Sequence, residues 1–352
     1  MRSAGRILVS IVLAGLVLTV PADARATVVT RAVTFKVENV NRSVLGCPSD
    51  GSKYEVKGHL IGPASELGPT ASGRRGAVTL YLHGLSFGEF LWNFTAVPRY
   101  DYAAAMARAG HTSVVIDRLG YGTSGHPEGN EACLGADADV AHQIVGELRS
   151  GDYGAQGRRS PRFTKVALAG HSIGALIANI EAISFDDVDA LVAMSYAPQI
   201  TYTTFEQFYQ SRGVCDGGGQ PAAPGGPGAY AYFQATPAEF EASAFDSAVP
   251  AVRAAAVALR APDPCGDGGS IIDGLVQDLK LLARVKVPVF VVCGREDATT
   301  PSFACPVLKS RYVGSRDTSL YFVPHAGHAL PLERTAPIFR RHVGAWLGAH
   351  GF

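Results

Sequence analysis

A serine flanked by two glycines carries the clearest chemical signal in this sequence. Residues 166–177 read as an apolar run, then Gly170-His-Ser172-Ile-Gly174, then a second apolar run with helical spacing. This order is typical of a nucleophile elbow, in which a strand, one sharp turn and a helix hold a serine hydroxyl above a sheet. Glycine has no Cβ, so Gly170 and Gly174 let the turn close tightly. Ser172 is therefore the candidate nucleophile.

A serine nucleophile needs a neighbouring base, and two histidines are candidates for this role. His325 and His328 both follow the last apolar run that is typical of a strand, where such a base is expected. His328 is preferred because Ala326-Gly327 directly precede it, and this small, bendable pair lets the loop fold over the edge of the sheet. His325 is the alternative.

The base in turn needs an acid that orients it, and this acid is expected after an earlier strand at the same sheet edge. The apolar run Val289–Cys293 is followed within four residues by Glu296 and Asp297. Asp297 is the preferred acid and Glu296 the alternative. The strand that ends at Met194 is followed by Ser-Tyr-Ala, without an acid, which removes the other usual location.

Two backbone N–H groups are expected to stabilise the oxyanion that forms during acyl transfer. One belongs to Ile173, directly after the nucleophile, and the other to Leu85, in the loop after His83-Gly84. Loss of one such donor typically costs about 100- to 1,000-fold in rate.

Two neighbouring motifs are assigned other roles. Asp117 ends a strand but precedes Ser172, whereas the acid of this kind of triad lies between the serine and the histidine. We expect Asp117 to orient its own loop by local pairing, with Arg118 as the candidate partner. Residues 120–125 fit the Gly-x-Gly-x-x-Gly dinucleotide fingerprint, but loop residues follow them instead of the helix that must meet a pyrophosphate. No cofactor is expected.

Strands that alternate with helices must position these groups. Residues 28–37 and 54–60 alternate apolar and polar side chains, as half-buried antiparallel edge strands do. Shorter apolar strands are expected at 77–82, 112–116, 165–168, 190–194, 287–292 and 318–323, and helices at 100–109, 136–149, 303–311 and 337–347. This order predicts an α/β fold, with a mostly parallel central sheet and helices on both faces.

The segment 197–283 interrupts the alternation. It contains Gly- and Pro-rich stretches, an aromatic patch and Ala-rich helical segments, but no strand-like run. We interpret it as an inserted helical and Gly-rich lid, with the core of the domain formed by 27–196 and 284–352. A long disordered loop is the alternative, which the aromatic residues and two cysteines disfavour.

The N-terminus is predicted to be a secretory signal peptide, residues 1–26. Arg2 and Arg6 precede the apolar run Ile7–Val20, and Ala24-Arg25-Ala26 is a small-x-small cleavage site. An uncleaved anchor is the alternative. Cleavage would take the formal net charge from 0 to −2, because three arginines and one aspartate leave with the segment. We expect a secreted protein with no stable membrane insertion and, without basic runs, no nucleic-acid partner.

All six cysteines lie after residue 26, and an even number in an exported chain predicts disulfides. One bridge would clamp the loop of Asp297, one would staple the lid, and the third would tie the N-terminal strands to the loop after Asp117. The predicted pairs are Cys293–Cys305, Cys215–Cys265 and Cys47–Cys133, with free buried cysteines as the alternative. No Cys/His cluster has zinc spacing, so no metal is expected. Asn41 and Asn93 begin sequons, which only a glycosylating host would use.

Taken together, these motifs resemble the α/β-hydrolase superfamily, of the lidded esterase, lipase and peptidase-like type. The matching pieces follow the family's order along the chain: His83-Gly84, Asp117–Ser124, Gly170–Gly174, Gly294–Asp297 and Ala326–Arg334. The resemblance implies that Ser172 is the nucleophile, His328 the base and Asp297 the acid, and that the substrate is a small-molecule or lipid-like ester.

The chain departs from two branches of that superfamily. Dehalogenase and epoxide-hydrolase relatives carry aspartate at the nucleophile position, where this chain has Ser172. The His-Gly-Gly-Gly oxyanion signature of some lipases is absent, because Leu85 and Ser86 follow Gly84.

The primary hypothesis is a secreted serine hydrolase that cleaves carboxylic esters through an acyl-enzyme. A lactonase, amidase or aminopeptidase with the same triad is one alternative. A non-catalytic exported binding protein on a hydrolase scaffold is another, since a fold does not determine a function. The complete triad disfavours the binding protein.

Overall fold

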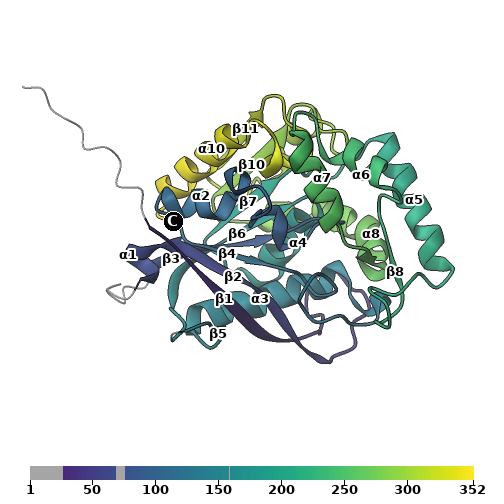
Figure 1. The fold of residues 1–352 in the computed structure, drawn as a ribbon, viewed down its shortest axis with the longest axis horizontal. Coiled ribbons are helices and arrows are strands. Elements are labelled where there is room, and N and C mark those ends of the chain that lie inside the picture. Colours follow the sequence, from purple (N-terminus) through teal and green to yellow (C-terminus); the bar gives the residue numbers. More distant parts are fainter. Residues whose placement is uncertain (1–26, 69–75, 158) are drawn as a thin grey trace, which may run out of the picture.

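One nine-stranded sheet organises the molecule, and a helical segment is inserted at one end of it (Figure 1). A computed structural model describes residues 27–68, 76–157 and 159–352. The predicted signal peptide, residues 1–26, lies outside the described residues. The strands lie in the order β11-β10-β7-β6-β3-β4-β2-β1-β5. Their bounds are Val28–Glu38 (β1), Lys53–Pro63 (β2), Gly76–Leu82 (β3), Ser113–Ile116 (β4), Gly154–Ala155 (β5), Phe163–His171 (β6), Ala190–Met194 (β7), Val289–Gly294 (β10) and Thr318–Val323 (β11).

Helices connect most of the parallel strands. The α-helices of the core are Ala64–Leu67 (α1), Tyr102–Arg108 (α2), Leu134–Ser150 (α3), Ile173–Phe185 (α4), Ala304–Arg311 (α9) and Ala336–Ala349 (α10). Short 3-10 helices are Glu89–Leu91 (η1), Pro98–Tyr100 (η2), Gly129–Glu131 (η3), Leu282–Arg284 (η4) and Leu330–Leu332 (η5).

The sheet is parallel from β4 through β11 and antiparallel at its other end. β3 pairs in parallel with β4 and β6, and the parallel pairing continues through β7 and β10 to β11. β2 pairs antiparallel with β4 and with β1. The predicted α/β class and mostly parallel sheet are confirmed. The edge beside β1 is taken by β5, a two-residue strand that the sequence does not signal.

Alternate residues of the central strands pack into two different layers. Val289, Val291 and Cys293 of β10 belong to one apolar cluster, whereas Phe290 and Val292 belong to the other. Side chains of α3, α4 and α9 fill the first layer, and those of α2 and α10 fill the second. Strands buried on both faces have almost no polar positions, which explains their unbroken apolar runs.

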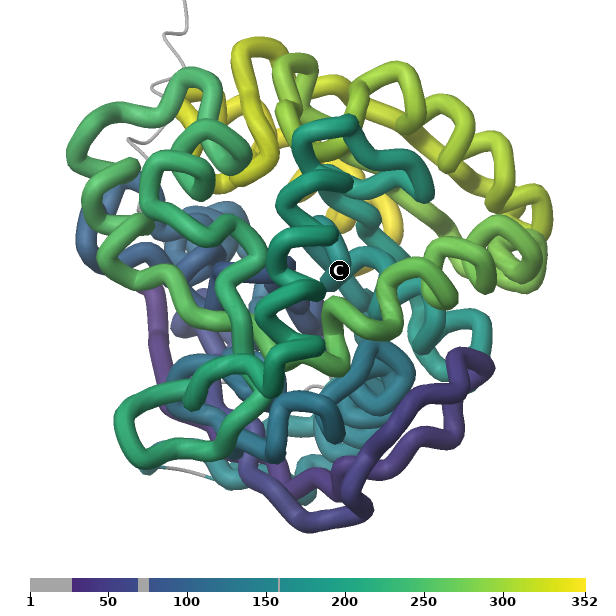
Figure 2. Tube along the Cα trace, turned by 90° about the vertical axis from the view of Figure 1, so that its right-hand side faces the viewer, coloured from purple at the N-terminus to yellow at the C-terminus, as the bar shows by residue number. Residues whose placement is uncertain are grey.

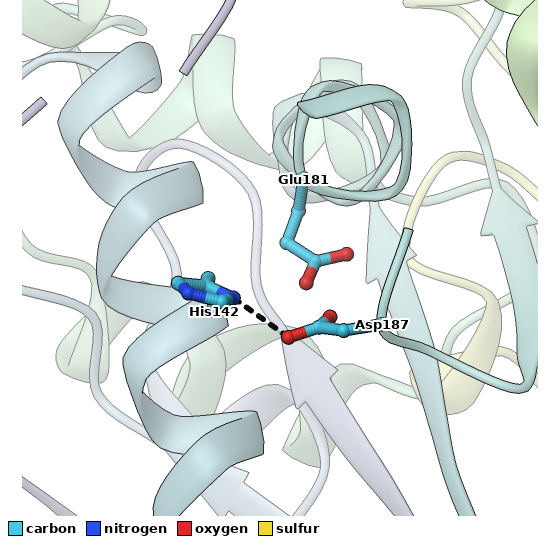
Figure 3. Close-up of side chains that lie close together, drawn as sticks. All are labelled: His142, Glu181 and Asp187. Carbon is cyan, nitrogen blue, oxygen red and sulfur yellow. Dashed lines mark hydrogen bonds and ion pairs between the residues drawn. The ribbon is translucent and has the colours of Figure 1, made fainter. Parts of the chain in front are cut away.

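α3 and α4 lie side by side on one face of the sheet. α3 ends at Gly151, whose φ of 80° is the left-handed conformation that glycine adopts without steric cost. Figure 3 shows His142 of α3 and Glu181 of α4 pointing into the space between the two helices.

The inserted segment covers the end of the sheet at which β6 meets α4 (Figures 1 and 2). Its helices are Tyr202–Asp216 (α5), Pro237–Ala244 (α6), Pro250–Leu259 (α7) and Cys265–Leu281 (α8), and its strands Tyr230–Ala231 (β8) and Asp263–Pro264 (β9) pair with each other. No strand is expected here from the sequence, because two residues are too few to produce an alternating pattern. A capping box of Thr236 and Glu239 begins α6.

Three disulfide bonds are present, and all six cysteines are used. They are Cys47–Cys133, Cys215–Cys265 and Cys293–Cys305, the pairs expected from the sequence. Among the described residues, no helix has both the length and the apolar character needed to cross a membrane.

Candidate active site

Ser172 occupies the sharp turn between β6 and α4. Its φ of 56° and ψ of −128° are uncommon for a residue with a side chain. The Ser172 N–H donates to the carbonyl of Met194 at 2.9 Å, which holds the strained turn against β7. Strain of this kind persists only where the surroundings over-determine the conformation, and it clusters at functional sites.

Three glycines make room for this turn. A Cβ on Gly170 would lie 2.1 Å from the carbonyl oxygen of Gly174, and one on Gly174 would lie 2.5 Å from that of Leu82. A Cβ on Gly84 would lie 2.7 Å from the Cβ of Ser172. Gly84 therefore lets the loop after β3 approach the serine as closely as it does.

The two predicted oxyanion donors lie next to Ser172. Ile173 is the first residue of α4, so its N–H has no partner within the helix. Leu85 follows Gly84, and the side chains of Leu85 and Ile173 line the same cavity as Ser172. Both N–H groups are thus near the serine, and their action on an oxyanion stays a prediction.

The structure pairs His328 with Asp297. Nδ1 of His328 lies 3.0 and 2.9 Å from the two carboxylate oxygens of Asp297, and both residues are buried. The N–H groups of Thr299 and Thr300 donate to Oδ1 of Asp297 at 2.8 and 2.9 Å. These backbone N–H groups fix the carboxylate of Asp297. The carboxylate therefore holds the imidazole of His328 in one orientation, with Nε2 available for other partners.

The alternatives from the sequence lie elsewhere. His325 is exposed, and its carbonyl accepts from Ser247 and Thr335. Glu296 accepts from the N–H of Ala326 at 3.1 Å, across the base of the histidine loop. Neither lines the cavity that Ser172 and His328 share. Ser172 and His328 make no hydrogen bond to each other here, a contact that often tightens only around a substrate.

Three residues without a predicted role hold the loop of His328. His171 donates from Nε2 to the carbonyl of His328 at 3.0 Å, and Ser195 donates to the same carbonyl at 2.7 Å. Burial, together with the neighbouring His328, lowers the pKa of His171 well below its usual value, so its ring stays neutral. Glu333, fully buried, accepts from the N–H of Gly327 at 2.9 Å.

A largely apolar cavity opens over Ser172. The core contributes Ser172, Ile173, Leu176, Tyr196 and His328 among others, and the inserted segment contributes residues from α5, α6 and α8. The inserted side chains include Phe208, Phe233, Phe240, Ile271, Ile272 and Leu275. The interpretation of the segment as a lid stays a prediction, but its side chains form much of the cavity wall.

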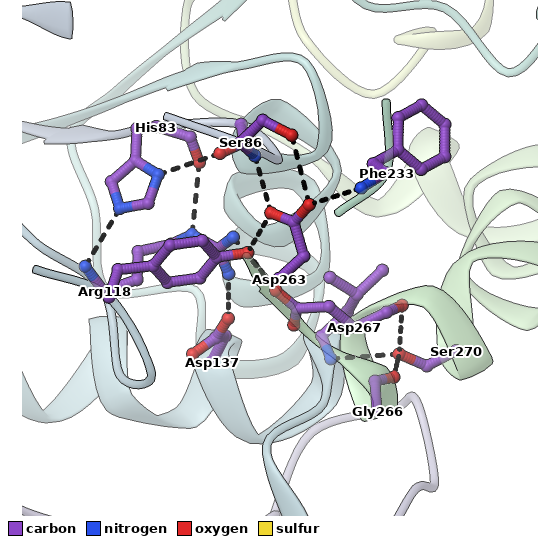
Figure 4. A network of polar contacts seen from close by, with 12 residues as sticks. His83, Ser86, Arg118, Asp137, Phe233, Asp263, Gly266, Asp267 and Ser270 are labelled. Atoms are coloured by element: carbon purple, nitrogen blue, oxygen red, sulfur yellow. Dashed lines mark hydrogen bonds and ion pairs between the residues drawn. The ribbon is translucent and has the colours of Figure 1, made fainter. Parts of the chain in front are cut away.

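A buried polar network contacts His83 and Ser86, which lie on either side of Gly84 and Leu85 in the chain (Figure 4). We call Arg118, Tyr121, Asp137, Asp263 and Asp267 the Arg118 network. Arg118 bonds to Asp137 and, at 3.0 Å, to Asp267, and its Nε donates to the carbonyl of His83 at 3.1 Å. Tyr121 donates to both Asp263 and Asp267 at 3.0 Å.

This network connects the inserted segment to the loop of the expected oxyanion donor. Asp263 of β9 accepts from the N–H of Ser86 at 2.5 Å, from its hydroxyl at 3.2 Å and from the N–H of Phe233 at 3.0 Å. Ser86 has a φ of 62°, so its backbone is held in a conformation that a serine rarely adopts. The position of Leu85, one residue earlier, therefore depends on a carboxylate of the inserted segment.

Burial controls the protonation of the network. It raises the pKa of Asp137 to about 8, despite the attraction of Arg118, and that of Asp263 to about 6. Because the pKa of Asp137 lies at about 8, this carboxyl group is largely protonated near neutral pH.

The expected pairing of Asp117 with Arg118 is wrong. Asp117 accepts from the N–H groups of Glu89 and Thr123, at 2.8 and 2.9 Å, and so orients two loops as expected. Neighbouring side chains after a strand point in opposite directions, and Arg118 points into the buried network instead. Gly120–Gly125 forms turns, and the next α-helix begins only at Leu134.

Among the described residues, one group of three has the donor atoms and spacing to hold a metal ion: His142, Glu181 and Asp187. None of the three lines the cavity over Ser172.

Comparisons with known proteins agree with this architecture. The family model described as the alpha/beta hydrolase family matches residues 80–341. An esterase from Thermogutta terrifontis superposes with a TM-score of 0.60 at 17% identity, covering 90% of this chain and 99% of that one. A monoacylglycerol lipase from Paleococcus ferrophilus superposes with a TM-score of 0.56 at 20% identity, covering 78% of this chain and 95% of that one. A hydrolase from Pseudomonas aeruginosa superposes with a TM-score of 0.59 at 17% identity, covering 86% of this chain and 97% of that one. A search of curated protein sequences finds no match.

Proposed function

This chain belongs to the alpha/beta hydrolase family, and we propose that it is a secreted serine hydrolase that cleaves carboxylic esters through an acyl-enzyme. The observation that carries the proposal is that Ser172 and a His328–Asp297 pair line one apolar cavity. A strained serine, a buried imidazole and a buried carboxylate are the three parts that acyl transfer by a serine needs.

In the proposed reaction, Ser172 attacks the ester carbonyl while Nε2 of His328 takes the hydroxyl proton. Asp297 holds Nδ1 of the imidazole and stabilises the imidazolium that forms. The N–H groups of Leu85 and Ile173 stabilise the negative oxygen of the tetrahedral intermediate. His328 then returns the proton to the leaving alcohol, and water repeats the sequence on the acyl-enzyme.

The cavity wall favours an apolar acyl group. Phenylalanine, leucine and isoleucine side chains from both the core and the inserted segment surround the space above Ser172. An ester with a hydrocarbon chain gains more from this surface than a charged or short one, because each buried CH₂ is worth about 0.8 kcal/mol. A lactone or an amide that presents an apolar group to the same wall is the alternative bond.

Secretion is supported by the three disulfide bonds. Disulfides of this kind persist in oxidising compartments and are rare in the cytosol.

The test is labelling by a fluorophosphonate together with hydrolysis of p-nitrophenyl esters of increasing chain length. We expect labelling of the wild type, a preference for longer acyl chains, and no labelling or hydrolysis by Ser172→Ala. Asp297→Asn and His328→Ala should each lower kcat by orders of magnitude, because the three residues act as one unit.

Matched controls come from the alternatives that lie outside the cavity. Glu296→Gln and His325→Ala should keep most of the activity. A folded wild type that neither labels nor hydrolyses any ester would favour a binding protein, and a crippled Glu296→Gln beside an active Asp297→Asn would make our acid assignment wrong.

A further inference from the structure

Three potential metal ligands meet on the face of the sheet that carries α3 and α4. His142 comes from α3, Glu181 from α4 and Asp187 from the loop between α4 and β7 (Figure 3). One ligand atom of each residue lies within 4.8 Å of the others. Nδ1 of His142 and Oδ2 of Asp187 are 2.6 Å apart. We call these three residues the His142 cluster.

Glu181 is the member of the cluster that needs explanation. It has no exposed surface, and neither of its carboxylate oxygens has a hydrogen-bond partner. Figure 3 shows the carboxylate pointing toward His142 and Asp187. Oδ1 of Asp187 is also buried without a partner. Burial of an ionised carboxylate without a partner is costly, so buried acids are usually paired or bind a metal.

The charged side chains around the cluster do not satisfy Glu181. Arg149 of α3 is the cation that acts on it, but its guanidinium donates to the carbonyl of Asp187 at 2.6 Å and to the carboxylate of Asp189 at 2.8 Å. Arg149 therefore leaves three carboxylate oxygens of the cluster free to accept.

We propose that His142, Glu181 and Asp187 bind one divalent cation of the zinc type. An imidazole nitrogen and two carboxylates are ligands that zinc accepts in a tetrahedral arrangement, with water in the fourth position. Water can reach the site, because the side chains of His142 and Asp187 are 32% and 26% exposed.

The positions of the ligands fit this role with small adjustments. Ligands about 2.0–2.2 Å from zinc are separated from one another by about 3.3 Å, within the spread of the three residues. The ring of His142 stacks on Phe185 with centroids 4.0 Å apart, which limits its orientation. A bound ion would join α3 to α4, the helix that begins beside Ser172, at a distance from the cavity.

A proton is the competing occupant. Burial, with the neighbouring Asp187, raises the pKa of Glu181 well above its usual value. A protonated Glu181 would donate to Asp187 and satisfy the cluster without a metal. A measurement of zinc binding distinguishes a metal ion from a proton at this site.

The experiment measures zinc binding by the intact, oxidised protein after removal of metal with EDTA. Equilibrium dialysis with ZnCl₂, followed by elemental analysis, should find one equivalent per chain, and zinc should raise Tm. Glu181→Gln and Asp187→Asn should lose this equivalent and the Tm increase. In parallel, CaCl₂ should bind more weakly, because calcium prefers ligands that are all oxygen.

His350→Ala is the matched control. His350 also pairs with an aspartate, Asp317, at 3.0 Å, but it lacks a buried third carboxylate. This variant should bind zinc like the wild type. Wild-type protein that binds no stoichiometric zinc, or Glu181→Gln that binds it equally, would overturn the proposal. An infrared band of a protonated buried carboxyl, lost in Glu181→Gln, would then assign the cluster to a shared proton.

Discussion

The Arg118 network and the His142 cluster both contain buried carboxylates, and they differ in whether a cation bonds to the buried group. In the network, the guanidinium of Arg118 bonds directly to Asp137 and Asp267. In the cluster, Glu181 has no bonded cation, since the guanidinium of Arg149 pairs with Asp189.

The difference shows how the same residue type can have opposite effects on stability. A buried carboxylate that bonds to an internal cation joins the elements that supply the two groups, here the core and the inserted segment. Without a cation it must take up a proton or bind an ion from solvent. The network is therefore part of the fold itself, whereas the cluster is suited to a ligand.

The largest effect on stability is expected from removal of the cation of the Arg118 network. Arg118→Met should leave buried carboxylates uncompensated and lower the free energy of unfolding by about 3–5 kcal/mol. Chemical denaturation measures this loss. Arg212→Met is the control, because its pair with Asp216 is exposed and should contribute about 0.5 kcal/mol or less. Equal losses in the two variants would contradict the role assigned to Arg118.

A second substitution separates the network's effect on catalysis from its effect on stability. Asp263→Asn removes one acceptor from the contacts to Ser86 and Phe233, which displaces the loop of Leu85. We expect kcat for ester hydrolysis to fall about tenfold or more with little change in KM, since loss of a whole oxyanion donor costs about 100-fold or more. Asp273→Asn, at an exposed position of α8, is the control. An unchanged kcat in Asp263→Asn would show that the loop holds its position without this carboxylate.

The protons of the network predict a pH dependence of stability. Asp137 and Asp263 have folded-state pKa values of about 8 and about 6, above the ordinary aspartate value of 3.8. The folded state thus binds protons more tightly than the unfolded state, and stability falls as pH rises from about 4 to about 8. Denaturation curves between pH 5 and 9 measure this slope. Asp137→Asn should make stability less dependent on pH in the upper part of this pH range. An unchanged dependence would contradict the raised pKa of Asp137.

The smallest effect on stability is expected for a substitution in the His142 cluster, which can be compared directly with the same kind of substitution in the Arg118 network. In metal-free protein, Glu181→Gln should change the free energy of unfolding by about 1 kcal/mol or less, or increase it, because it removes a buried group without a bonded cation. Asp267→Asn, the equivalent change in the network, should cost about 1.5–3 kcal/mol, since it weakens a hydrogen bond to a charged group. Denaturation in EDTA compares the two. A larger loss in Glu181→Gln than in Asp267→Asn would reverse the conclusion.

Much of the fold and of the candidate site follows from local sequence patterns. The strand-turn-helix around Ser172 is a contiguous segment. The glycines at 170 and 174 are required because a Cβ at these positions would lie 2.1 and 2.5 Å from a carbonyl oxygen. Strands such as β10 are recognisable because burial on both faces excludes polar residues. The loop positions of Asp297 and His328 follow from chain order in the family pattern, and the structure brings these two side chains together.

Other features cannot be read from local patterns. Glu333 belongs to a recognised motif, but its role depends on N–H groups of Asp246, Ser247 and Gly327, from two separate loops. The expectation of no metal rested on Cys/His spacing, whereas the His142 cluster combines residues of two helices and a loop. Spacing along the sequence reveals only metal ligands that lie near one another in the chain.

The sequence by itself therefore determined most strands of the sheet, the turn of Ser172 and the loops of the expected acid and base, because steric limits and burial patterns act over a few residues. Only the tertiary structure decided which buried charges meet. The pairing of Arg118 is the clearest case: its neighbour Asp117 is close in sequence but points away, while Asp267, 149 residues further on, lies 3.0 Å from it. Desolvation makes a buried charge costly unless a partner is present, and packing of distant elements selects that partner.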